Sequence, residues 1–380
     1  MPEDSMKHRV SVILPTYNRA HLIGETIQSL LEQTLVPDEI LVIDDGSSDN
    51  TPAVLARYQG LRVVRTENKG KASALNLALT LVTGDLVWIV DDDDLLLPHA
   101  CKALSAPLEN EPGLDFCAGR HLDFEIDEDT GQKTTRPPGY MRDSSPEQIF
   151  PDLLEGCHVF QPGLMVRKCI YDAAGPFNTS LVRSQDYEMI LRIARYHRGM
   201  QLSEVVFLHR EHSGRRGSAT DGFAATENAE RWAAFNRRIF LPLLDDLADE
   251  ELLAAKDLEK LPPALRRRAA RVKRGCVLAR QRMWPEAIAA WQEAAAMNST
   301  PLAELEREML ARSPNSALGA PELLADVDVR RGLVALSRMT SPGPEMAATL
   351  RQASRWHVRA AVRAGDWRRA AQGVRFLLAR

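Results

Sequence analysis

Four consecutive aspartates, Asp91–Asp94, directly follow the apolar run Leu86–Val90. Neighbouring carboxylates repel one another, so four of them beside a dry strand require cations or protons. Carboxylate oxygens completed by phosphate and water suit Mg²⁺ or Mn²⁺. If the chain stays extended, Asp91 and Asp93 project to one side and Asp92 to the other. The run therefore indicates a divalent-cation site; the alternative is a set of acids that caps a helix and suits its dipole.

Two further polar segments follow apolar runs in the same way. Asp44–Asp49, which reads DDGSSD, comes after Glu39–Ile43, and Pro15–Asn18 comes after Val10–Leu14. The segment after the first run offers an aromatic face and amide groups, which suit a base or a ribose. A turn and helix cap would account for the Gly, the Ser residues and the last Asp of DDGSSD. The pair of aspartates at its start is explained less well in that way.

Alternating strand and helix patterns must position these three segments. The predicted strands are Val10–Leu14, Glu39–Ile43, Leu61–Val64 and Leu86–Val90, and the predicted helices are Ile23–Leu31, Thr51–Tyr58 and Lys71–Leu81. Strands that are apolar on both faces are typical of parallel sheets covered by helices on both sides. Open α/β sheets bind ligands at the carboxyl ends of their strands, so we expect the polar segments to meet there. The predicted fold class is α/β, with a mostly parallel sheet, followed by an all-α domain.

The alternation loosens after residue 100. The further predictions are a helix over Pro98–Leu108, a strand over Leu114–Ala118, a hairpin or loop over Gly119–Tyr140, helices over Gln148–Leu154 and Gln185–Tyr196, and a strand over Val205–Leu208. The sequence RRGSATDG then breaks the pattern. We therefore expect a catalytic domain over residues 1–217 and a helical domain over residues 218–380.

The second part of the chain is rich in Ala, Leu and Arg and predicts helices throughout. Trp284–Ala294 has the aromatic and Ala spacing of the second helix of a tetratricopeptide repeat, and Trp367–Val374 repeats part of it. Two partial copies do not make an array, because adjoining repeats must share a core. A helical bundle with Trp in its core is the equal alternative. We expect this domain to bind a partner or to mediate self-association.

Charge and composition restrict the function. Residues 1–220 carry 22 Lys and Arg against 32 Asp and Glu, whereas residues 221–380 carry 26 against 20. An acidic first part argues against a nucleic-acid partner, which needs a basic footprint. For the basic second part, solvated helix faces are favoured over an anionic partner or membrane surface. No apolar run has the length of a membrane span, no signal peptide is read, and the five cysteines are scattered. These features predict a cytoplasmic protein, with the inner face of the membrane as a peripheral location.

The segments VSVILPTYNR, EILVIDDGSSD, ENKGKASALNLAL and GDLVWIVDDDDLLLP occur in this order. Together they closely resemble family 2 glycosyltransferases, which have the Rossmann-like GT-A fold. The resemblance continues through Gly163–Arg167, Ala174–Phe177 and Ser184–Glu188 and ends at His209–His212. It implies an inverting enzyme that uses a nucleotide-diphosphate sugar, commonly a UDP-sugar, with Mn²⁺ or Mg²⁺.

The same resemblance implies how the donor is bound. The residues that it places at the donor are Pro15, Thr16, Tyr17, Asn18, Asp45, Lys71, Asp91 and Asp92. Among them, Asp45 would hydrogen-bond the base, commonly uracil. Leu75 stands where the family often has an Arg, so Lys69 or Lys71 is expected to contact the diphosphate instead.

For the chemistry, Asp91 and Asp93 match the DxD carboxylates of the family, and Asp93 is the expected direct metal ligand. His212 holds the R-x-H position and is expected to approach the metal or the diphosphate. Asp186 matches the catalytic base at the start of a helix, although Gln185 replaces the Glu that usually precedes it. The pattern alone is equally consistent with Asp186 as the N-cap of that helix.

The favoured function is therefore a single-displacement glycosyltransferase that acts on an unidentified sugar or lipid-linked acceptor. One alternative is an inactive nucleotide-sugar-binding or scaffold protein that acts through its helical domain. A nucleotidyltransferase would need a Gly-rich basic loop after the first strand, where PTYNRAH stands. His209, Glu211 and His212 lack the HExxH spacing of a zinc site, so a hydrogen-bonded or phosphate-facing His is favoured there.

Overall fold

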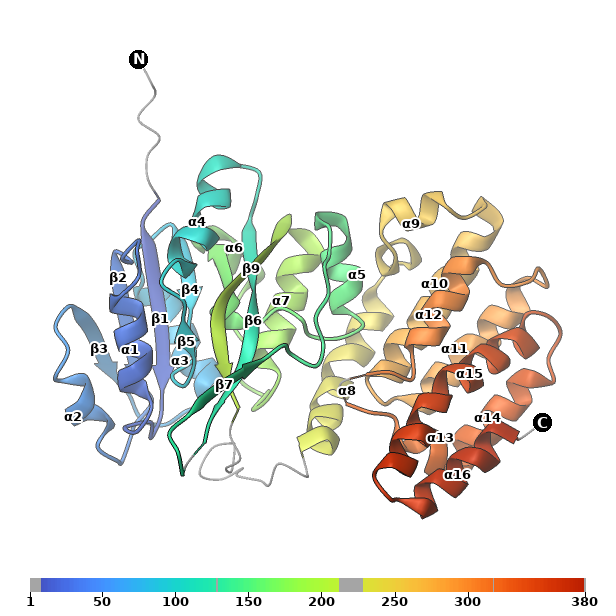
Figure 1. Ribbon diagram of the computed structural model, residues 1–380. Helices are drawn as coiled ribbons and strands as arrows, with labels where there is room; N and C mark the ends of the chain where they lie inside the picture. The colour runs from blue at the N-terminus through green and yellow to red at the C-terminus, as the bar shows by residue number, and fades with distance from the viewer. Residues whose placement is uncertain (1–7, 128, 212–227, 317, 379–380) are drawn as a thin grey trace. The chain divides into compact units, whose positions relative to one another are not determined.

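The structure is a computed structural model that describes residues 8–127, 129–211, 228–316 and 318–378. It divides into two compact units, coloured blue to green and mainly yellow to red in Figure 1. The sheet unit comprises Met1–Phe150 and Cys157–Ala225, and the helical unit comprises Pro151–Gly156 and Thr226–Arg380. The expected boundary between residues 217 and 218 lies in segment 212–227, outside the described residues.

One mixed sheet forms the centre of the sheet unit. Its strands are β1 Val10–Thr16, β2 Glu39–Asp44, β3 Leu61–Arg65, β4 Leu86–Ile89, β5 Leu95–Leu96, β6 Phe116–Ile126, β7 Lys133–Arg136, β8 Leu164–Arg167 and β9 Gly199–Arg210. Their order is β3-β2-β1-β4-β8-β6-β9-β5, with β7 paired to β6. The strands β3, β2, β1 and β4 are parallel, β8 is antiparallel to β4 and β6, and β6 is parallel to β9.

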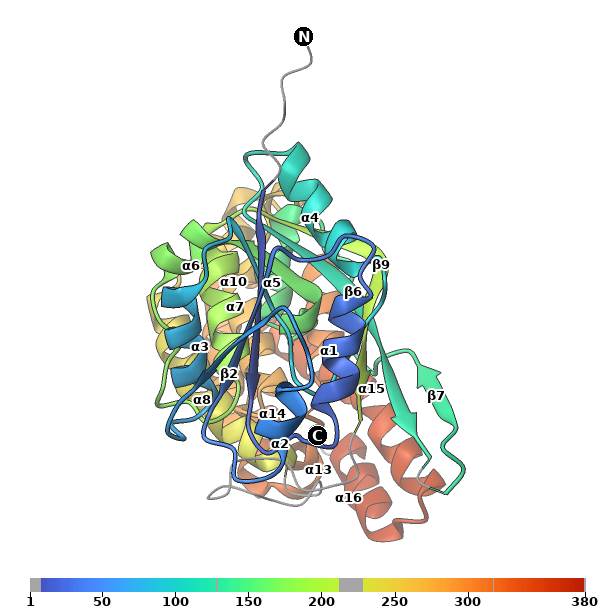
Figure 2. The same cartoon turned by 90° about the vertical axis from the view of Figure 1, so that its left-hand side faces the viewer.

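Helices cover both faces of this sheet. The helices of the sheet unit are α1 Ile23–Leu31, α2 Thr51–Leu55, α3 Lys71–Leu81, α4 Ala100–Asn110, α6 Lys168–Ala174 and α7 Gln185–Tyr196, with short 3₁₀ turns η1 Pro146–Gln148 and η2 Gln161–Gly163. The short helix α5 Ile149–Leu153 begins in the sheet unit and ends in the helical unit. In Figure 2, α1 and α4 lie on one face and α3, α6 and α7 on the other. Hydrogen bonds agree: Gln33, just after α1, accepts from the backbone of Cys101 in α4, and Asn76 in α3 exchanges two bonds with Phe177 after α6.

The apolar patterns explain these elements. Every residue of β1 and β4 is buried, as expected for strands covered on both faces. The bounds predicted for α1, α3 and α7 are confirmed, because their apolar residues recur at helical spacing. Strand β6 extends eight residues beyond its predicted end at Ala118, to Ile126. The sequence did not predict this extension, because Gly and Asp have low strand propensity. Pairing with β8, β9 and β7 stabilises it.

Apart from Pro151–Gly156, the described residues of the helical unit follow those of the sheet unit in the chain. Its helices are α8 Asn228–Asp246, η4 Asp249–Leu252, α9 Ala255–Glu259, α10 Pro263–Arg280, α11 Trp284–Met297, α12 Glu304–Arg312, α13 Pro321–Ala325, α14 Val327–Ser337, α15 Gly343–Arg363 and α16 Trp367–Leu378. Trp284 and Trp291 are fully buried and meet edge to face, which confirms Trp in the core. Trp367, by contrast, is 70% exposed, so the second partial repeat does not bury its tryptophan.

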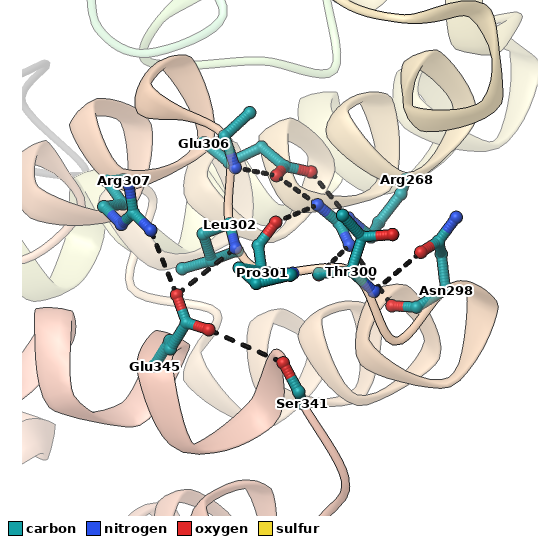
Figure 3. Close-up of polar contacts among 10 residues, drawn as sticks. Arg268, Asn298, Thr300, Pro301, Leu302, Glu306, Arg307, Ser341 and Glu345 are labelled. Carbon is teal, nitrogen blue, oxygen red and sulfur yellow. Dashed lines mark hydrogen bonds and ion pairs between the residues drawn. The ribbon is translucent and has the colours of Figure 1, made fainter.

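A buried ion pair joins α10 to α12. Arg268 and Glu306 are both excluded from solvent and form two hydrogen bonds, of 2.8 and 2.6 Å (Figure 3). The remaining Arg268 donors bond backbone oxygens of the segment before α12, including Thr300 O at 2.6 Å. Because every charge here has a partner, the pair fixes how the α11–α12 connection lies against α10.

Candidate functional site

The carboxyl ends of β1, β2 and β4 lie side by side at one edge of the sheet. Strand β1 pairs in parallel with both neighbours, and its last residue, Thr16, lies opposite Asp44 at the end of β2. Pro15 and Thr16 therefore close β1, and Tyr17 and the following residues leave it at this edge. The three polar segments singled out in the sequence thus share one edge, as expected from a parallel sheet.

Asp91–Asp94, here called the acidic turn, leaves β4 at this edge. Asp92 and Asp93 form a turn, so the condition of an extended run, under which Asp91 and Asp93 would project to one side, is not met. The helix-cap alternative is also wrong, because β5 follows at Leu95 and α4 begins only at Ala100. The turn gives its four carboxylates different neighbours.

Two cations from other elements face the first three carboxylates. Lys71, the first residue of α3, forms an ion pair with Asp91. Arg19, from the segment after β1, has Nε 3.4 Å from Asp92 Oδ1 and Nη2 3.6 Å from Asp93 Oδ2. Positive side chains thus lie beside the acidic turn. The carboxylates would attract a metal cation, and Lys71 and Arg19 would attract a diphosphate.

The fourth carboxylate is part of the framework. Asp94 is 1% exposed and accepts the backbone N–H of Arg210, the last residue of β9, at 2.9 Å. The Arg210 side chain donates from Nε to the carbonyl oxygen of Asp93 at 2.8 Å and pairs with Glu25 of α1 at 2.7 Å. The end of β9 therefore holds the acidic turn in place.

Burial and mutual repulsion affect the protonation of these groups. Burial raises the pKa of Asp91, Asp92 and Asp94, and the neighbouring Asp93 raises each of them further. For Asp92 the pKa rises to about 7, despite the opposing charge of Arg19. Burial alone would lower the pKa of Lys71, but the charges of Asp91 and Asp186 outweigh it and raise the pKa. A divalent cation would relieve the repulsion within the turn.

Asp186 interacts electrostatically with this cluster from a distant part of the chain. It is the second residue of α7 and is half-buried, and its charge acts on both Lys71 and Asp91. The N-cap position belongs to Ser184, in the left-handed conformation with φ 58°, so the reading of Asp186 as the N-cap is wrong. Its carboxylate accepts only the adjacent N–H of Tyr187 among the bonds described, at 2.9 Å.

Asn18 joins the segments after β1 and β2. Its backbone is left-handed, with φ 52°, and its side-chain oxygen accepts the N–H groups of Ser48 at 2.7 Å and Asp49 at 3.2 Å. Its own backbone N–H donates to the Ser47 hydroxyl at 2.9 Å. The Asn18 amide, expected to meet a nucleotide, therefore also shapes the loops around it.

Asp45 fastens the loop before α3. Its two carboxylate oxygens accept the backbone N–H groups of Lys69 at 2.9 Å and Gly70 at 2.8 Å, and the residue is 4% exposed. Oδ1 also accepts the Thr66 hydroxyl at 3.4 Å, whereas Oδ2 keeps a second lone pair that can accept from a base. Gly46 follows with φ 79°, and a Cβ there would lie 2.8 Å from the Asn68 backbone nitrogen. Only Gly fits this turn.

Arg19 and Arg210 are functional-site residues that the sequence pattern did not indicate. Both lie inside quoted motifs, PTYNR and HREH, but their contacts with the acidic turn join residues 74 and 117 positions apart at the longest. The signal that could have identified Arg19 is its position directly after Pro15–Asn18, the segment expected to face a nucleotide. His212, the third expected metal ligand, lies outside the described residues.

Comparison with known proteins agrees with this geometry. The family model described as glycosyl transferase family 2 matches residues 11–168, which contain β2, β4, the acidic turn and all of β1 but its first residue. A Mycobacterium tuberculosis protein, uncharacterized protein MT1568, is 30% identical over 268 residues, 67% of this chain and 82% of that protein. The chain belongs to glycosyltransferase family 2. Its fold and enzyme class are thereby those that the sequence motifs predicted.

Named glycosyltransferases are among the relatives of this family 2 member. The uncharacterized glycosyltransferase YwdF of Bacillus subtilis is 28% identical, over 50% of this chain and 69% of YwdF. The Escherichia coli enzyme WfgD, a UDP-Glc:α-D-GlcNAc-diphosphoundecaprenol β-1,3-glucosyltransferase, is 28% identical, over 49% of this chain and 70% of WfgD. An uncharacterized glycosyltransferase of Rickettsia typhi, RT0329, is covered over only 64% of its length.

Solved structures share the fold of this glycosyltransferase. Staphylococcus aureus TarS 1–349 in complex with UDP-GlcNAc matches with a TM-score of 0.53 and 18% identity, over 94% of this chain and 92% of that one. TarS 1–349 alone matches with a TM-score of 0.52. The sheet is thus of the GT-A type and is followed by a helical region. Among the described residues, no helix has both the length and the apolar character needed to cross a bilayer.

Proposed function

We propose that the protein is an inverting glycosyltransferase that transfers a sugar from a nucleotide-diphosphate donor to an acceptor hydroxyl. The observation that carries this proposal is the electrostatic interaction of Asp186, at the start of α7, with Lys71 of α3 and with Asp91 of the acidic turn. A base and a phosphate-binding cluster are the two requirements of such a transfer. Residues 1–217 are proposed as the catalytic domain.

The residues at the acidic turn fit a divalent cation. The donors of Asp91 and Asp93 are carboxylate oxygens alone, and burial together with repulsion makes the ionised turn unfavourable without added positive charge. Asp93 and Asp91 would hold Mn²⁺ or Mg²⁺, with His212 as the expected third protein ligand. When bound, the ion supplies Lewis-acid stabilisation of the departing diphosphate.

The protein's own residues would carry the remaining steps. Asp186 takes the proton of the acceptor hydroxyl while the oxygen of that hydroxyl bonds to the anomeric carbon. The bond from that carbon to the diphosphate oxygen breaks, and its electron pair leaves with the diphosphate, so a single displacement inverts the anomeric centre. Lys71 and Arg19 lie where they can offset the negative charge that develops.

The donor is proposed to be a UDP-sugar. WfgD is named for its use of UDP-Glc, and the matched TarS structure holds UDP-GlcNAc. In this chain, Tyr17 and Asp45 are the residues proposed to receive the base, and Asp92 is proposed to face the sugar or ribose. Polysaccharide, glycolipid or glycoconjugate synthesis is the proposed context.

The helical unit is proposed to work at an anionic lipid surface. We call the exposed side of α15 and α16 the basic aromatic face. Its Trp356 and Trp367 are 59% and 70% exposed. Its exposed cationic residues are Arg355, Arg359, Arg363, Arg368 and Arg375. Asp366 is the only acid between residues 346 and 378. Arg together with exposed Trp is the composition that binds anionic interfaces, so a lipid-linked acceptor is the acceptor class proposed.

Transfer or hydrolysis of UDP-sugars with Mn²⁺ tests the enzyme proposal. The wild type is expected to release UDP, Asp93→Ala to lose release and metal-dependent UDP binding, and Asp186→Asn to lose release by about 10²–10⁴-fold while still binding UDP. Asp172→Asn, an exposed acid on α6, is the matched control and should keep full activity. A wild type that binds UDP-sugars but never releases UDP would support the alternative, a catalytically inactive scaffold. Equal activity of all variants would contradict the site.

A further inference from the structure

A second group of potential metal ligands lies on β6 and β9. His121 and Asp123 are two positions apart on β6, so they project from the same face of the sheet. Asp123 is the direct cross-strand partner of His209 on β9, and such partners have neighbouring side chains. Three donors from two adjacent strands thus converge without any loop.

The distances suit one small ion. His209 Nδ1 lies 3.1 Å and His121 Nε2 3.7 Å from Asp123 Oδ1, and the three donor atoms all lie within 4.8 Å of one another. Tetrahedral Zn²⁺ with bonds of about 2.0–2.1 Å places neighbouring ligand atoms roughly 3.3 Å apart. Small shifts of the two imidazole rings would therefore close the site around an ion.

The cluster is buried on the side of His121 and Asp123 and partly open to solvent at His209. The side chains of His121 and Asp123 are 3% and 10% exposed, whereas that of His209 is 26% exposed. The ring of Phe160 lies against both imidazoles, with centroids 4.6 Å from His121 and 5.6 Å from His209. An ion held by three ligands would thus keep a coordination position toward the exposed side.

The cluster is separate from the acidic turn but connected to it through the backbone. His209 and Arg210 are consecutive on β9, so their side chains project to opposite faces. Arg210 holds Asp93 and Asp94, while His209 faces Asp123. The two groups therefore lie on opposite sides of one strand end.

We propose that His121, Asp123 and His209 bind a divalent transition-metal ion, Zn²⁺ in the first instance, at a site distinct from the cation of the donor diphosphate. Imidazole nitrogens with one carboxylate select Zn²⁺ over Mg²⁺, which prefers oxygen ligands. The ion joins β6 to β9 and so steadies the strand end from which Arg210 holds the acidic turn. The alternative is a metal-free hydrogen-bonded His–Asp–His group.

Cobalt substitution separates these two outcomes. Metal-stripped full-length protein is titrated with Co²⁺, whose visible absorption is intense in a tetrahedral site with nitrogen ligands. One equivalent is expected to produce this spectrum in the wild type, and excess Zn²⁺ but not Mg²⁺ should remove it. His209→Gln and His121→Asn are expected to lower Co²⁺ affinity by at least about 10–100-fold, the loss seen even for residues that only support a ligand.

Two controls keep the result interpretable. Asp93→Ala should retain the cobalt spectrum, because it changes only the acidic turn. If Asp93→Ala loses the spectrum, the cobalt ion is bound at the acidic turn and the proposed site is contradicted. His209 is partly exposed, so His209→Gln should keep the circular dichroism of the wild type. This variant tests the site even if His121→Asn, at the more buried position, fails to fold. A wild type without the spectrum, or His variants that retain it, would overturn the proposal. The readout does not depend on sugar transfer, so it stands or fails separately from the proposed function.

Discussion

At the residue scale, the acidic turn brings together carboxylates whose ionised forms are destabilised by the fold. Asp91 and Asp92 are half-buried and Asp94 is buried, and their pKa values rise because of desolvation and the neighbouring charge of Asp93. Arg19 and Lys71 offset part of the repulsion. Such perturbed carboxylates are typical of functional sites, because a ligand restores the stability that the free protein lacks.

The protonation of Asp92 predicts a pH dependence of stability without metal. Its pKa is about 7 in the folded chain, against the ordinary value of 3.8, so the folded state binds the proton more tightly. This contribution to stability is complete below about pH 4 and is lost as the pH rises to about 7. In EDTA, the urea midpoint of Asp92→Asn should therefore vary less between pH 5 and pH 7.5 than that of the wild type. An unchanged pH slope would contradict the burial of this charge.

At the element scale, the positions of strand ends and loops decide the site. Parallel β1, β2 and β4 bring their carboxyl ends together, and the loops after them are tied by Asn18 and Asp45. The end of β9 adds Arg210 from the opposite direction in the chain. The loops thus have little freedom to accommodate larger residues.

Gly46 and Gly60 offer a matched comparison of two left-handed glycines. Both have positive φ, 79° and 82°, but a Cβ at Gly46 would lie 2.8 Å from a backbone nitrogen, whereas at Gly60 nothing lies within 4 Å. Gly60→Ala should cost only the conformational term, about 1–2 kcal/mol. Gly46→Ala should cost more and should also weaken UDP binding, as measured by urea unfolding and calorimetry. Equal effects of the two substitutions would refute the steric argument.

The buried pair between α10 and α12 predicts a large and asymmetric effect. Arg268→Met leaves Glu306 charged and without its partner, so it should destabilise the helical unit by about 3–5 kcal/mol. Adding Glu306→Leu should recover much of this loss. Arg307→Met, which removes the half-exposed pair with Glu345, should cost only about 0–1 kcal/mol. Urea unfolding followed by the fluorescence of the buried Trp284 and Trp291 provides the measurement.

At the scale of the whole molecule, the charge is divided between the two parts of the chain. The first part is acidic, and the second carries an excess of Arg. The sequence favoured solvated helix faces for these Arg residues. The exposure of Trp356 and Trp367 among them adds an apolar component that solvation does not explain, and the basic aromatic face follows from it.

Vesicle co-sedimentation tests this face. The full chain is expected to sediment with phosphatidylglycerol vesicles but not with phosphatidylcholine vesicles, and high salt should release it. The double variant Trp356→Ser, Trp367→Ser should reduce the bound fraction several-fold, whereas Arg330→Ala, Arg331→Ala on α14 should change it less. Loss of self-association in the Trp variant without any vesicle binding would instead identify a second copy of the chain as the occupant.

Local pattern alone determined the elements that end at the site. Apolar runs predicted β1, β2 and β4, helical spacing predicted α1, α3 and α7, and the acidic run marked a strand end. These features depend on neighbours within a few positions, so a single sequence contains them. Family motifs added the roles expected of Asp93 and Asp186, which periodicity could not assign.

Only the tertiary structure decided which groups meet. The charge of Asp186 acts on Asp91, 95 positions earlier in the chain, and Arg19 and Arg210 approach the acidic turn from opposite ends of the sheet unit's chain. His121, Asp123 and His209 converge because β6 pairs with β9 in one particular register. Strand order and register arise from the packing of the whole sheet, since no local pattern specifies which distant strand becomes a neighbour.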